Sequence, residues 1–483
     1  MNTCENITPS PGKITKKSFR KNIKVTALSL IKKIRDFDIC TTFSYWWSNE
    51  SKAAKTAFFS ALIIGFVSNL FVYTYRYFGD HDLGVVYTFI TMPEQGRPFN
   101  LNALLNHGYI LPLTSGVFVS FFLGVAAFFF CKLFSVNKKV SGLLIGALLS
   151  TFPTISVWNK FIFITADIYL GMALAVIAVY LTVRYKKGFI LGAFLLMFAL
   201  SIYQANVNVA VVLCMLYLVS QLMCKDISNR VIVVRAVRFI TLGGLSAIFY
   251  IFLLRFMDMS PDYRGFDTMQ DRLLSFSGIV NALRVVLADF HRVFFGNFFL
   301  NVNVLRYSYI FLAMLLLYFV LAGILRHKIY KNPIRLIIIV GLLLFAPFGS
   351  MFASILQDGP SASQTLSPIV YLLAFVVVIC ERYVGRLVIF RSLTILCILL
   401  ISINYVILNN IVYMRLAFLN QRTNSVAIQL MTDINPLIPQ SSSNQIAFFV
   451  EIIGHHSSNF DLDGGIKPCA QGGWTIAWRY ISN

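Results

Sequence analysis

The chain has 483 residues, of which 58% are hydrophobic and 13% are charged, and its formal net charge is +21. A soluble domain carries roughly 25% charged residues, so this composition excludes an ordinary soluble protein and predicts a polytopic membrane protein within the lipid bilayer. The positive charge does not indicate nucleic-acid binding, because Lys and Arg occur in short segments between apolar runs, the pattern that orients membrane helices.

The first segment, 1–56, is basic. Within it, positions 23–47 place apolar residues at helical spacing around Lys32, Lys33 and Arg35, and the aromatic triplet Tyr45-Trp46-Trp47 ends the stretch. This pattern is typical of an amphipathic helix on the cytoplasmic leaflet with an aromatic anchor, although a plain basic lead-in fits the same residues. We expect 1–56 to form a cytoplasmic basic and amphipathic segment.

A region of long apolar runs, 57–411, is predicted to form an all-α transmembrane domain. A spanning helix needs roughly 20 apolar residues, and eleven runs approach that length. Between them lie two large outer segments, 79–109 and 257–306, and 268–295 has the apolar spacing of an interfacial helix. The eleven runs are 57–78, 110–131, 139–157, 162–183, 188–203, 207–224, 237–256, 307–325, 336–353, 367–380 and 390–411.

Proline at position 153 stands inside the third run, near its end. A proline in a membrane helix frees a backbone carbonyl, and neighbouring groups must satisfy that carbonyl because lipid offers no hydrogen bonds. We therefore expect a kink at Pro153 that is tolerated only if another helix supplies a partner.

The charge distribution predicts the orientation of the chain. Short loops such as Arg184-Tyr185-Lys186-Lys187 and Arg326-His327-Lys328 are basic and alternate with less basic ones. Basic loops face the cytoplasm, so the N-terminus is predicted inside and the C-terminus outside. The tail 412–483 contains a strand-like segment at 444–450 and glycine pairs typical of turns, which predict a small periplasmic α+β domain.

The first outer segment contains Asp80-His81-Asp82, in a chain with only 20 acidic residues against 41 Lys and Arg. A carboxylate beside another carboxylate has a raised pKa, which suits a general base acting on a hydroxyl. The alternatives are solvated loop acids balanced by Arg76 and Arg97, or an Asp-Xaa-Asp site for the metal of a nucleotide-sugar. Nucleotide-sugars are absent outside the cell, so we expect Asp82 or Asp80 to be catalytic and no cofactor, although a divalent metal stays possible.

Several other polar residues are candidates for substrate binding in the first outer segment. Glu94, Arg97 and His107 all lie there. The planar guanidinium of Arg97 could hold a phosphate through two hydrogen bonds, or Arg97 and Glu94 could form a charged turn before a short helix. Both interpretations stay open for this segment.

Candidates also occur at the ends of later spans. Lys160 follows the outer end of the third run and Asp167 lies inside the fourth, where an ionisable group indicates function unless the two simply pair. Tyr203 and Gln204 join the fifth and sixth runs. They could stack on a sugar ring and bind its hydroxyls, or form a polar hairpin. Arg264 lies in the second outer segment.

The order of these motifs resembles the type II Gtr family of phage-type serotype-converting O-antigen glucosyltransferases. The likeness rests on the basic N-terminus, the Asp80/Asp82 pair, Gly96-Arg97-Pro98 and Ile202-Tyr203-Gln204-Ala205, and it covers about 57–380. Members usually have two adjacent acids after the first span, whereas here His81 separates them. The role of base therefore falls on Asp80 or Asp82, with a slight preference for Asp82, which is further from the span.

The resemblance implies a GT-C-like glycosyltransferase of the bacterial inner membrane. Such an enzyme takes glucose from undecaprenyl-phosphate-glucose and attaches it to O-antigen repeat units of lipopolysaccharide at the periplasmic face, in a single displacement at C1. The leaving phosphate is an anion and needs cations, which Arg97, Lys160, Arg264 and Arg292 could supply. The alternatives are another polyprenyl-phosphate-linked sugar transferase, an O-antigen polymerase or, less favoured, a lipid-sugar flippase or transporter, which would show inverted repeats.

Overall fold

The computed structural model describes residues 38–75, 97–99, 111–224, 227–259, 276–296, 303–352, 363–383 and 388–434. In these residues 88% of positions are helical and no strand occurs, so the all-α prediction holds for the described part of the chain. The chain divides into two compact units, Met1–Ser51 and Lys52–Asn483.

The first unit contributes one described helix, α2 (Ile39–Asn49). Asp38 caps it, because a carboxylate oxygen of Asp38 accepts a hydrogen bond from the Cys40 backbone N–H at 2.9 Å. Its aromatic residues contact one another, with the rings of Phe43 and Trp47 stacked at 6.2 Å between centroids. The end of the predicted amphipathic helix at 23–47 therefore is helical, and its earlier part lies outside the described residues.

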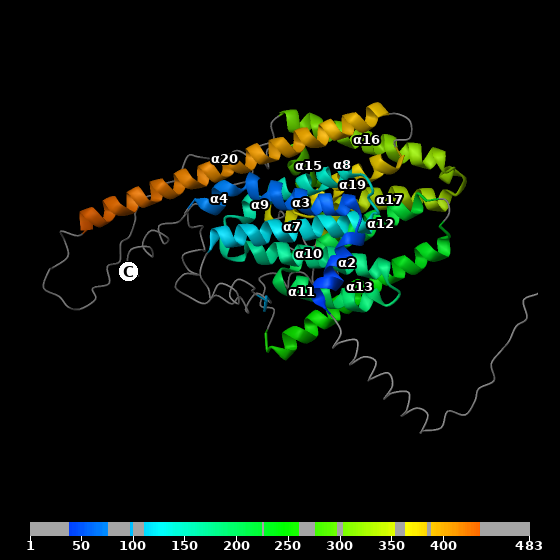
Figure 1. Ribbon diagram of the computed structural model, residues 1–483, viewed down its shortest axis with the longest axis horizontal. Coiled ribbons are helices and arrows are strands. Elements are labelled where there is room, and N and C mark those ends of the chain that lie inside the picture. Colours follow the sequence, from blue (N-terminus) through cyan, green and yellow to red (C-terminus); the bar gives the residue numbers. More distant parts are fainter. Residues whose placement is uncertain are drawn as a thin grey trace, which may run out of the picture. The chain divides into compact units, whose positions relative to one another are not determined.

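The second unit is a bundle of helices (Figure 1). The helices are α3 (Lys52–Ser68), α4 (Leu70–Thr74), α7 (Pro112–Leu133), α8 (Lys139–Thr151), α9 (Thr154–Trp158), α10 (Ile162–Arg184), α11 (Gly188–Ile202), α12 (Val207–Leu222), α13 (Asn229–Phe256), α15 (Phe276–Phe294), α16 (Asn303–Arg326), α17 (Pro333–Ser350), α19 (Ile369–Tyr383) and α20 (Val388–Ile434), with 3-10 turns η2 (Gln204–Asn206), η3 (Ile329–Lys331) and η4 (Ser363–Leu366).

Eight helices in the described part are long and apolar enough to cross a membrane. The predicted runs 57–78, 188–203 and 367–380 fall instead on shorter helices: α3 has 17 residues before it breaks, and α11 and α19 have 15 each. The membrane character is thus supported, while the count of eleven spans is not confirmed. The eight are Pro112–Leu133, Lys139–Trp158, Ile162–Arg184, Gln204–Leu222, Asn229–Phe256, Asn303–Arg326, Pro333–Ser350 and Val388–Arg422.

The centre of the bundle is formed by α8 and α10. In their apolar windows 89% and 78% of the residues are buried by other helices. Small residues allow the close approach of α8 to α3, since a Cβ on Gly142 would lie 2.2 Å from the Ala53 carbonyl oxygen and one on Gly146 2.4 Å from that of Ala57. Glycines spaced by four residues are typical of helices packed in membranes, where dispersion contacts replace the hydrophobic effect.

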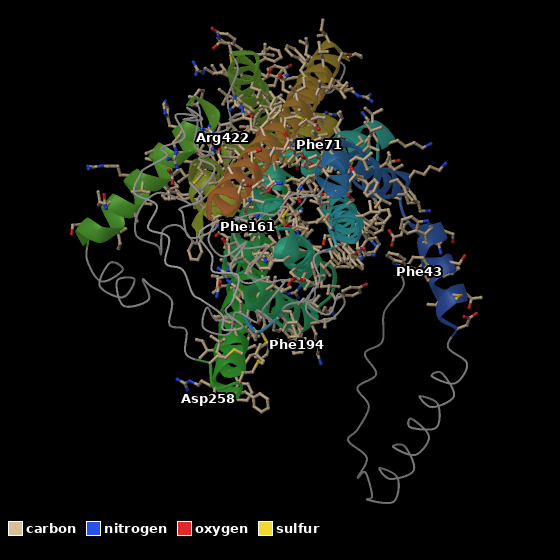
Figure 2. All side chains as sticks on the ribbon, turned by 90° about the vertical axis from the view of Figure 1, so that its left-hand side faces the viewer. Phe43, Phe71, Phe161, Phe194, Asp258 and Arg422 are labelled. Atoms are coloured by element: carbon tan, nitrogen blue, oxygen red, sulfur yellow. The ribbon has the colours of Figure 1, made fainter. Side chains whose placement is uncertain are left out.

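The helices α13 and α17 lie at the periphery. Only 22% and 28% of their apolar windows are buried. Large apolar side chains such as Ile240 and Phe256 on α13 are therefore exposed, at 76% and 81%, and Figure 2 shows Phe194 on α11 near the edge of the bundle. Such a surface is unfavourable in water and suits lipid, which agrees with the membrane assignment.

Helix α20 is 47 residues long and passes position 411 without a break. At 1.5 Å per residue it measures roughly 70 Å, about twice what a bilayer core needs. Figure 1 shows its C-terminal part extending past α4. The predicted periplasmic α+β domain at 412–483 therefore begins, in the described residues, as a continuation of this helix to Ile434; its strand-like segment at 444–450 lies outside them.

We call the end of the bundle with Lys132, Lys187, Arg326 and Arg335 the basic end. There, charged side chains bind the backbone of neighbouring helix ends. One carboxylate oxygen of Glu381 accepts hydrogen bonds from the backbone N–H groups of Asn137 and Lys138, at 2.8 and 3.3 Å, and so caps the start of α8. Arg382 donates to the Phe134 carbonyl oxygen, and Arg335 donates to those of Cys224 and Ile227.

The opposite end, which we call the site end, contains α4, α9, Tyr203 and η2. Two helices break as they reach it: α3 ends at Ser68 and resumes as α4, and α8 ends at Thr151 and resumes as α9 after Pro153. The predicted kink at Pro153 is thus a full break. The Asn409 side chain on α20 donates to the Thr151 carbonyl oxygen at 2.8 Å, which is the kind of neighbour that such a break requires.

Candidate active site

Three of the predicted site residues meet at the site end of the bundle. The guanidinium carbon of Arg97 lies 4.7 Å from the centre of the Tyr203 ring. The Arg97 Nε donates a hydrogen bond to Gln204 Oε1 at 3.3 Å. Arg97 thus contacts both predicted sugar-binding residues, 106 and 107 positions further along the chain, through a cation–π contact and a polar one.

The aromatic Tyr203 is itself held by a second ring. Trp158, at the end of α9, meets Tyr203 edge to face, with ring centroids 5.1 Å apart and planes at 88°. Both side chains are buried, at 2% and 7% exposure. An edge-to-face aromatic pair is favourable and geometrically specific, so Tyr203 presents a fixed ring to Arg97.

The local backbone explains why Tyr203 points into the bundle. Helix α11 ends at Ile202, and Tyr203 is extended before η2 begins a tight turn into α12. The Asn206 side chain of this turn donates to the Ala199 carbonyl oxygen at 3.1 Å and packs against α10 at Gly171, where a Cβ would lie 2.2 Å from Asn206 Nδ2. A glycine at 171 therefore permits this turn to lie against α10.

The amide of Gln204 links the site to another helix. Its Nε2 donates to the hydroxyl of Tyr250 on α13 at 3.1 Å. Sequence reasoning missed Tyr250, because a single tyrosine in an apolar run is typical of a membrane interface. Phe99 and Phe198 were also missed; their rings meet edge to face at 4.9 Å and hold the segment 97–99 on α11.

Lys160 and Asp167 lie in the neighbouring elements. Lys160 is half-buried two residues after Trp158, and Asp167 is 3% exposed within the second turn of α10. Phe161, labelled in Figure 2, stands between α9 and α10. The burial of a carboxyl group inside a span agrees with the reasoning that singled out Asp167. An ion pair between Lys160 and Asp167 stays a prediction.

Five predicted site residues fall outside the described residues, and their roles stay predictions. These are Asp80, Asp82, Glu94, His107 and Arg264. Of the residues named for the leaving phosphate, Arg292 is described: on α15 it donates to Asp289 at 2.8 Å, so a carboxylate already balances part of its charge. Within the described residues, no three His, Cys, Asp or Glu side chains gather in a way that could hold a metal ion.

The described cluster contains two kinds of chemical group. The Arg97 guanidinium uses Nε toward Gln204, which leaves its two Nη groups as the pair that matches phosphate oxygens. The adjacent aromatic rings and the Gln204 amide are groups that stack on sugar rings and bind hydroxyls. An anion and a sugar could therefore be bound side by side.

The apolar helices and this cation–aromatic cluster together define a polytopic helical membrane protein with a polar site at one end of its bundle. Residues 80–381, more than half of the chain, match the protein family described as Glucosyl transferase GtrII. The chain therefore belongs to the GtrII glucosyl transferase family and is a glycosyltransferase, as the resemblance of its motifs predicted. No curated protein and no solved structure matches the chain.

The first and last residues of the matched region coincide with features described above. It begins at Asp80, the first of the two acids, and ends at Glu381, in the last turn of α19. Arg97, Trp158, Tyr203, Gln204 and Tyr250 all lie inside it. Helices α3, α4 and α20 lie outside the matched residues, although they pack against α7 or α8 inside them.

Proposed function

We propose that this glycosyltransferase moves a glucosyl residue from undecaprenyl-phosphate-glucose to the O-antigen repeat units of lipopolysaccharide at the periplasmic face of the bacterial inner membrane, which would convert the serotype. The observation that carries the proposal is the Arg97 guanidinium held between the Tyr203 ring and Gln204. A donor that is both a phosphate and a sugar needs a fixed cation next to sugar-binding groups.

The reaction would be a single displacement. A carboxylate, Asp82 or Asp80, takes the proton from an acceptor hydroxyl; the acceptor oxygen bonds to C1 of the glucose; and the bond from C1 to the phosphate oxygen breaks. Negative charge then grows on the leaving polyprenyl phosphate. Arg97, with Lys160 and Arg264, would stabilise that charge, because fixed cations in a water-poor site are favourable without reorganisation. Glu94, His107 and Asp167 would line the acceptor and donor sites.

The proposed membrane orientation places the basic end in the cytoplasm. Lys and Arg at the turns of that end, such as Lys132, Arg184, Arg326 and Arg335, are the feature that supports it. Segment 1–56 would then be cytoplasmic, 57–411 would form the transmembrane transferase domain with its outer segments 79–109 and 257–306, and 412–483 would be periplasmic. Reporter fusions at residues 270 and 430 test this: cytoplasmic signals at both would reverse the orientation.

Mass spectrometry of lipopolysaccharide tests the transfer itself. The protein would be produced in cells that make undecaprenyl-phosphate-glucose, with the Asp82→Asn variant as the matched control. We expect one added hexose per O-antigen repeat unit with the wild type and far less with the variant. An unmodified repeat unit would refute the proposed acceptor, and a change only in chain length would favour a polymerase instead.

A further inference from the structure

Helix α20 lies outside the region that matches the glucosyl transferase family, yet it places four polar side chains against the site end. Asn409, Asn410, Tyr413 and Gln421 all donate hydrogen bonds to elements other than α20. Asn409 and Tyr413 are four residues apart, so they lie on the same face of the helix. Asn409 and Tyr413 are both fully buried, at 0% exposure.

The first contact of α20 is with the break between α3 and α4. The Asn410 amide donates to the Ser68 carbonyl oxygen at 3.1 Å, and the Tyr413 hydroxyl donates to Asn69 Oδ1 at 2.6 Å. Asn69 in turn donates to the Gly65 carbonyl oxygen at 2.7 Å. The interrupted end of α3 therefore receives its hydrogen bonds from α20 and from Asn69, which fixes the direction in which α4 leaves the break.

The second contact is with the break between α8 and α9. Besides the bond from Asn409 to Thr151, the Asn159 side chain donates from Nδ2 to the Tyr413 hydroxyl at 2.8 Å. The Tyr413 oxygen thus accepts from Asn159, at the C-terminal end of α9, and donates to Asn69 at the break between α3 and α4. Its surroundings are apolar, since Val72, Tyr73 and Ile162 pack with it in one buried cluster.

These contacts link α20 to the candidate site. Asn159 adjoins Trp158, which holds Tyr203, which holds Arg97. In the other direction, the Tyr413 hydroxyl donates to Asn69, directly before α4. Tyr413 thus connects the start of α4 to the chain of contacts that ends at Arg97.

We propose that Tyr413 is a positioning residue for glucosyl transfer, acting through Asn69 and Asn159 on the two broken helices that flank the candidate site. It lies too deep in the bundle, at 0% exposure, to act as a surface contact for the acceptor. Small displacements of a reacting group are costly in rate, so loss of this bridge lowers the rate of the chemical step more than the binding of the donor. The inference rests on the proposed function, because the rate of transfer is one of its readouts.

The variant Tyr413→Phe tests the proposal, and Tyr405→Phe is its matched control. Tyr405 is on the same helix, is 1% exposed, and its hydroxyl shares a hydrogen bond of 2.7 Å with the Tyr309 hydroxyl on α16. Its ring contacts Phe152 at the end of α8, and phenylalanine at position 405 keeps that contact. Each variant loses one buried hydroxyl that makes hydrogen bonds. With purified protein and a short-chain polyprenyl-phosphate-glucose, we expect kcat to fall about 10-fold in Tyr413→Phe with the donor KM within about twofold, and to be unchanged in Tyr405→Phe.

A second readout does not depend on activity. Hydrogen exchange should become faster in Tyr413→Phe at residues 69–75 and 155–160, and in Tyr405→Phe near 305–310 instead. The milder variant Asn410→Ala should reproduce the effect at 69–75 alone. Unchanged exchange at both 69–75 and 155–160, an unchanged kcat, or an equal loss of kcat in both tyrosine variants would overturn the proposal. A wild type that transfers no glucose would refute the proposed function, while the exchange data would still decide whether Tyr413 holds these two segments.

Discussion

The two ends of the bundle differ in the side chains that hydrogen-bond to the backbone groups left unpaired at helix ends and breaks. At the basic end, ionised side chains do this: Glu381 caps α8, and Arg335 and Arg382 bind carbonyl oxygens of nearby turns. At the site end, neutral amides do this: Asn69, Asn409 and Asn410 bind backbone carbonyl oxygens. The Tyr413 hydroxyl holds the Asn69 amide in turn, and Asn69 and Tyr413 are at most 1% exposed.

The difference follows from the cost of burying charge. An ion at a partly exposed helix end keeps much of its solvation, whereas a buried ion without a partner is very unfavourable and a buried amide needs only hydrogen bonds. Helix breaks inside the bundle are therefore held by neutral groups. It follows that an ionisable group at the site end, such as Arg97 or Asp167, needs a functional explanation, while one at the basic end does not.

Among the substitutions that test this comparison, those of the acids in the first outer segment should change the transfer rate most. Asp82→Asn keeps the size of the side chain and removes the proposed base, so the transfer rate should fall about 1,000-fold. The rate per folded molecule, measured with a short-chain donor, checks this. Asp80→Asn is the matched control and should have the smaller effect; full activity in both variants would show that the acidic segment has no catalytic role.

Arg97 should have the next largest effect. Arg97→Ala removes the cation beside Tyr203, and kcat/KM for the donor should fall about 100-fold. Arg97→Lys keeps the charge but loses the planar fork that stacks on the ring, so we expect it to restore only a small part of the activity. If lysine restored the full rate, charge alone would matter and the stacking on Tyr203 would be irrelevant.

At the basic end, the expected effect is on stability alone. Glu381→Ala leaves the backbone N–H groups of Asn137 and Lys138 without their acceptor and should reduce the stability of the bundle by about 1–2 kcal/mol. Glu381→Gln retains an acceptor oxygen and should lose less. Thermal unfolding in detergent measures both; a change of kcat per folded molecule in either variant would break the distinction between the two ends.

The smallest effect is expected at α2, where the same capping chemistry occurs on an exposed helix. Hydrogen bonds from the Thr41 side chain and the Cys40 backbone N–H lower the pKa of Asp38 from 3.8. A lowered pKa means that the carboxylate stabilises the helix above the unfolded pKa and that this contribution disappears as the pH falls through the folded pKa. Hydrogen exchange at 39–42 should therefore be slower in the wild type than in Asp38→Ala near neutral pH and equal well below pH 3.8.

Part of the candidate site could be predicted from residue types alone. Arg97, Asp167, Tyr203 and Gln204 stood out because polar groups beside apolar runs are costly without a role. Their contact in space could not be predicted, because Arg97 and Gln204 are 107 positions apart and no local sequence pattern relates them. Tyr250 was missed because it resembles an ordinary interfacial tyrosine.

The polar residues of α20 could also be noticed in the sequence, but their hydrogen-bond partners could not be predicted from it. Asn409 and Asn410 interrupt an apolar run and could have been noted for the same reason as Asp167. Their partners, the carbonyl oxygens of Thr151 and Ser68, are backbone groups that become available only where α8 and α3 break. A break at Pro153 could be anticipated, whereas Asn69 is a weak signal for one.

The sequence by itself determined the membrane class, the helical content of the described residues, the basic loops and the membership of the glucosyl transferase family, because composition, periodicity and short motifs are local properties. Only the tertiary structure decided that three predicted runs form short helices, that Arg97 lies on Tyr203, and that one tyrosine joins the break between α3 and α4 to the end of α9. Those outcomes depend on how helices far apart in the chain pack, and a buried polar group takes whichever partner that packing brings within hydrogen-bonding distance.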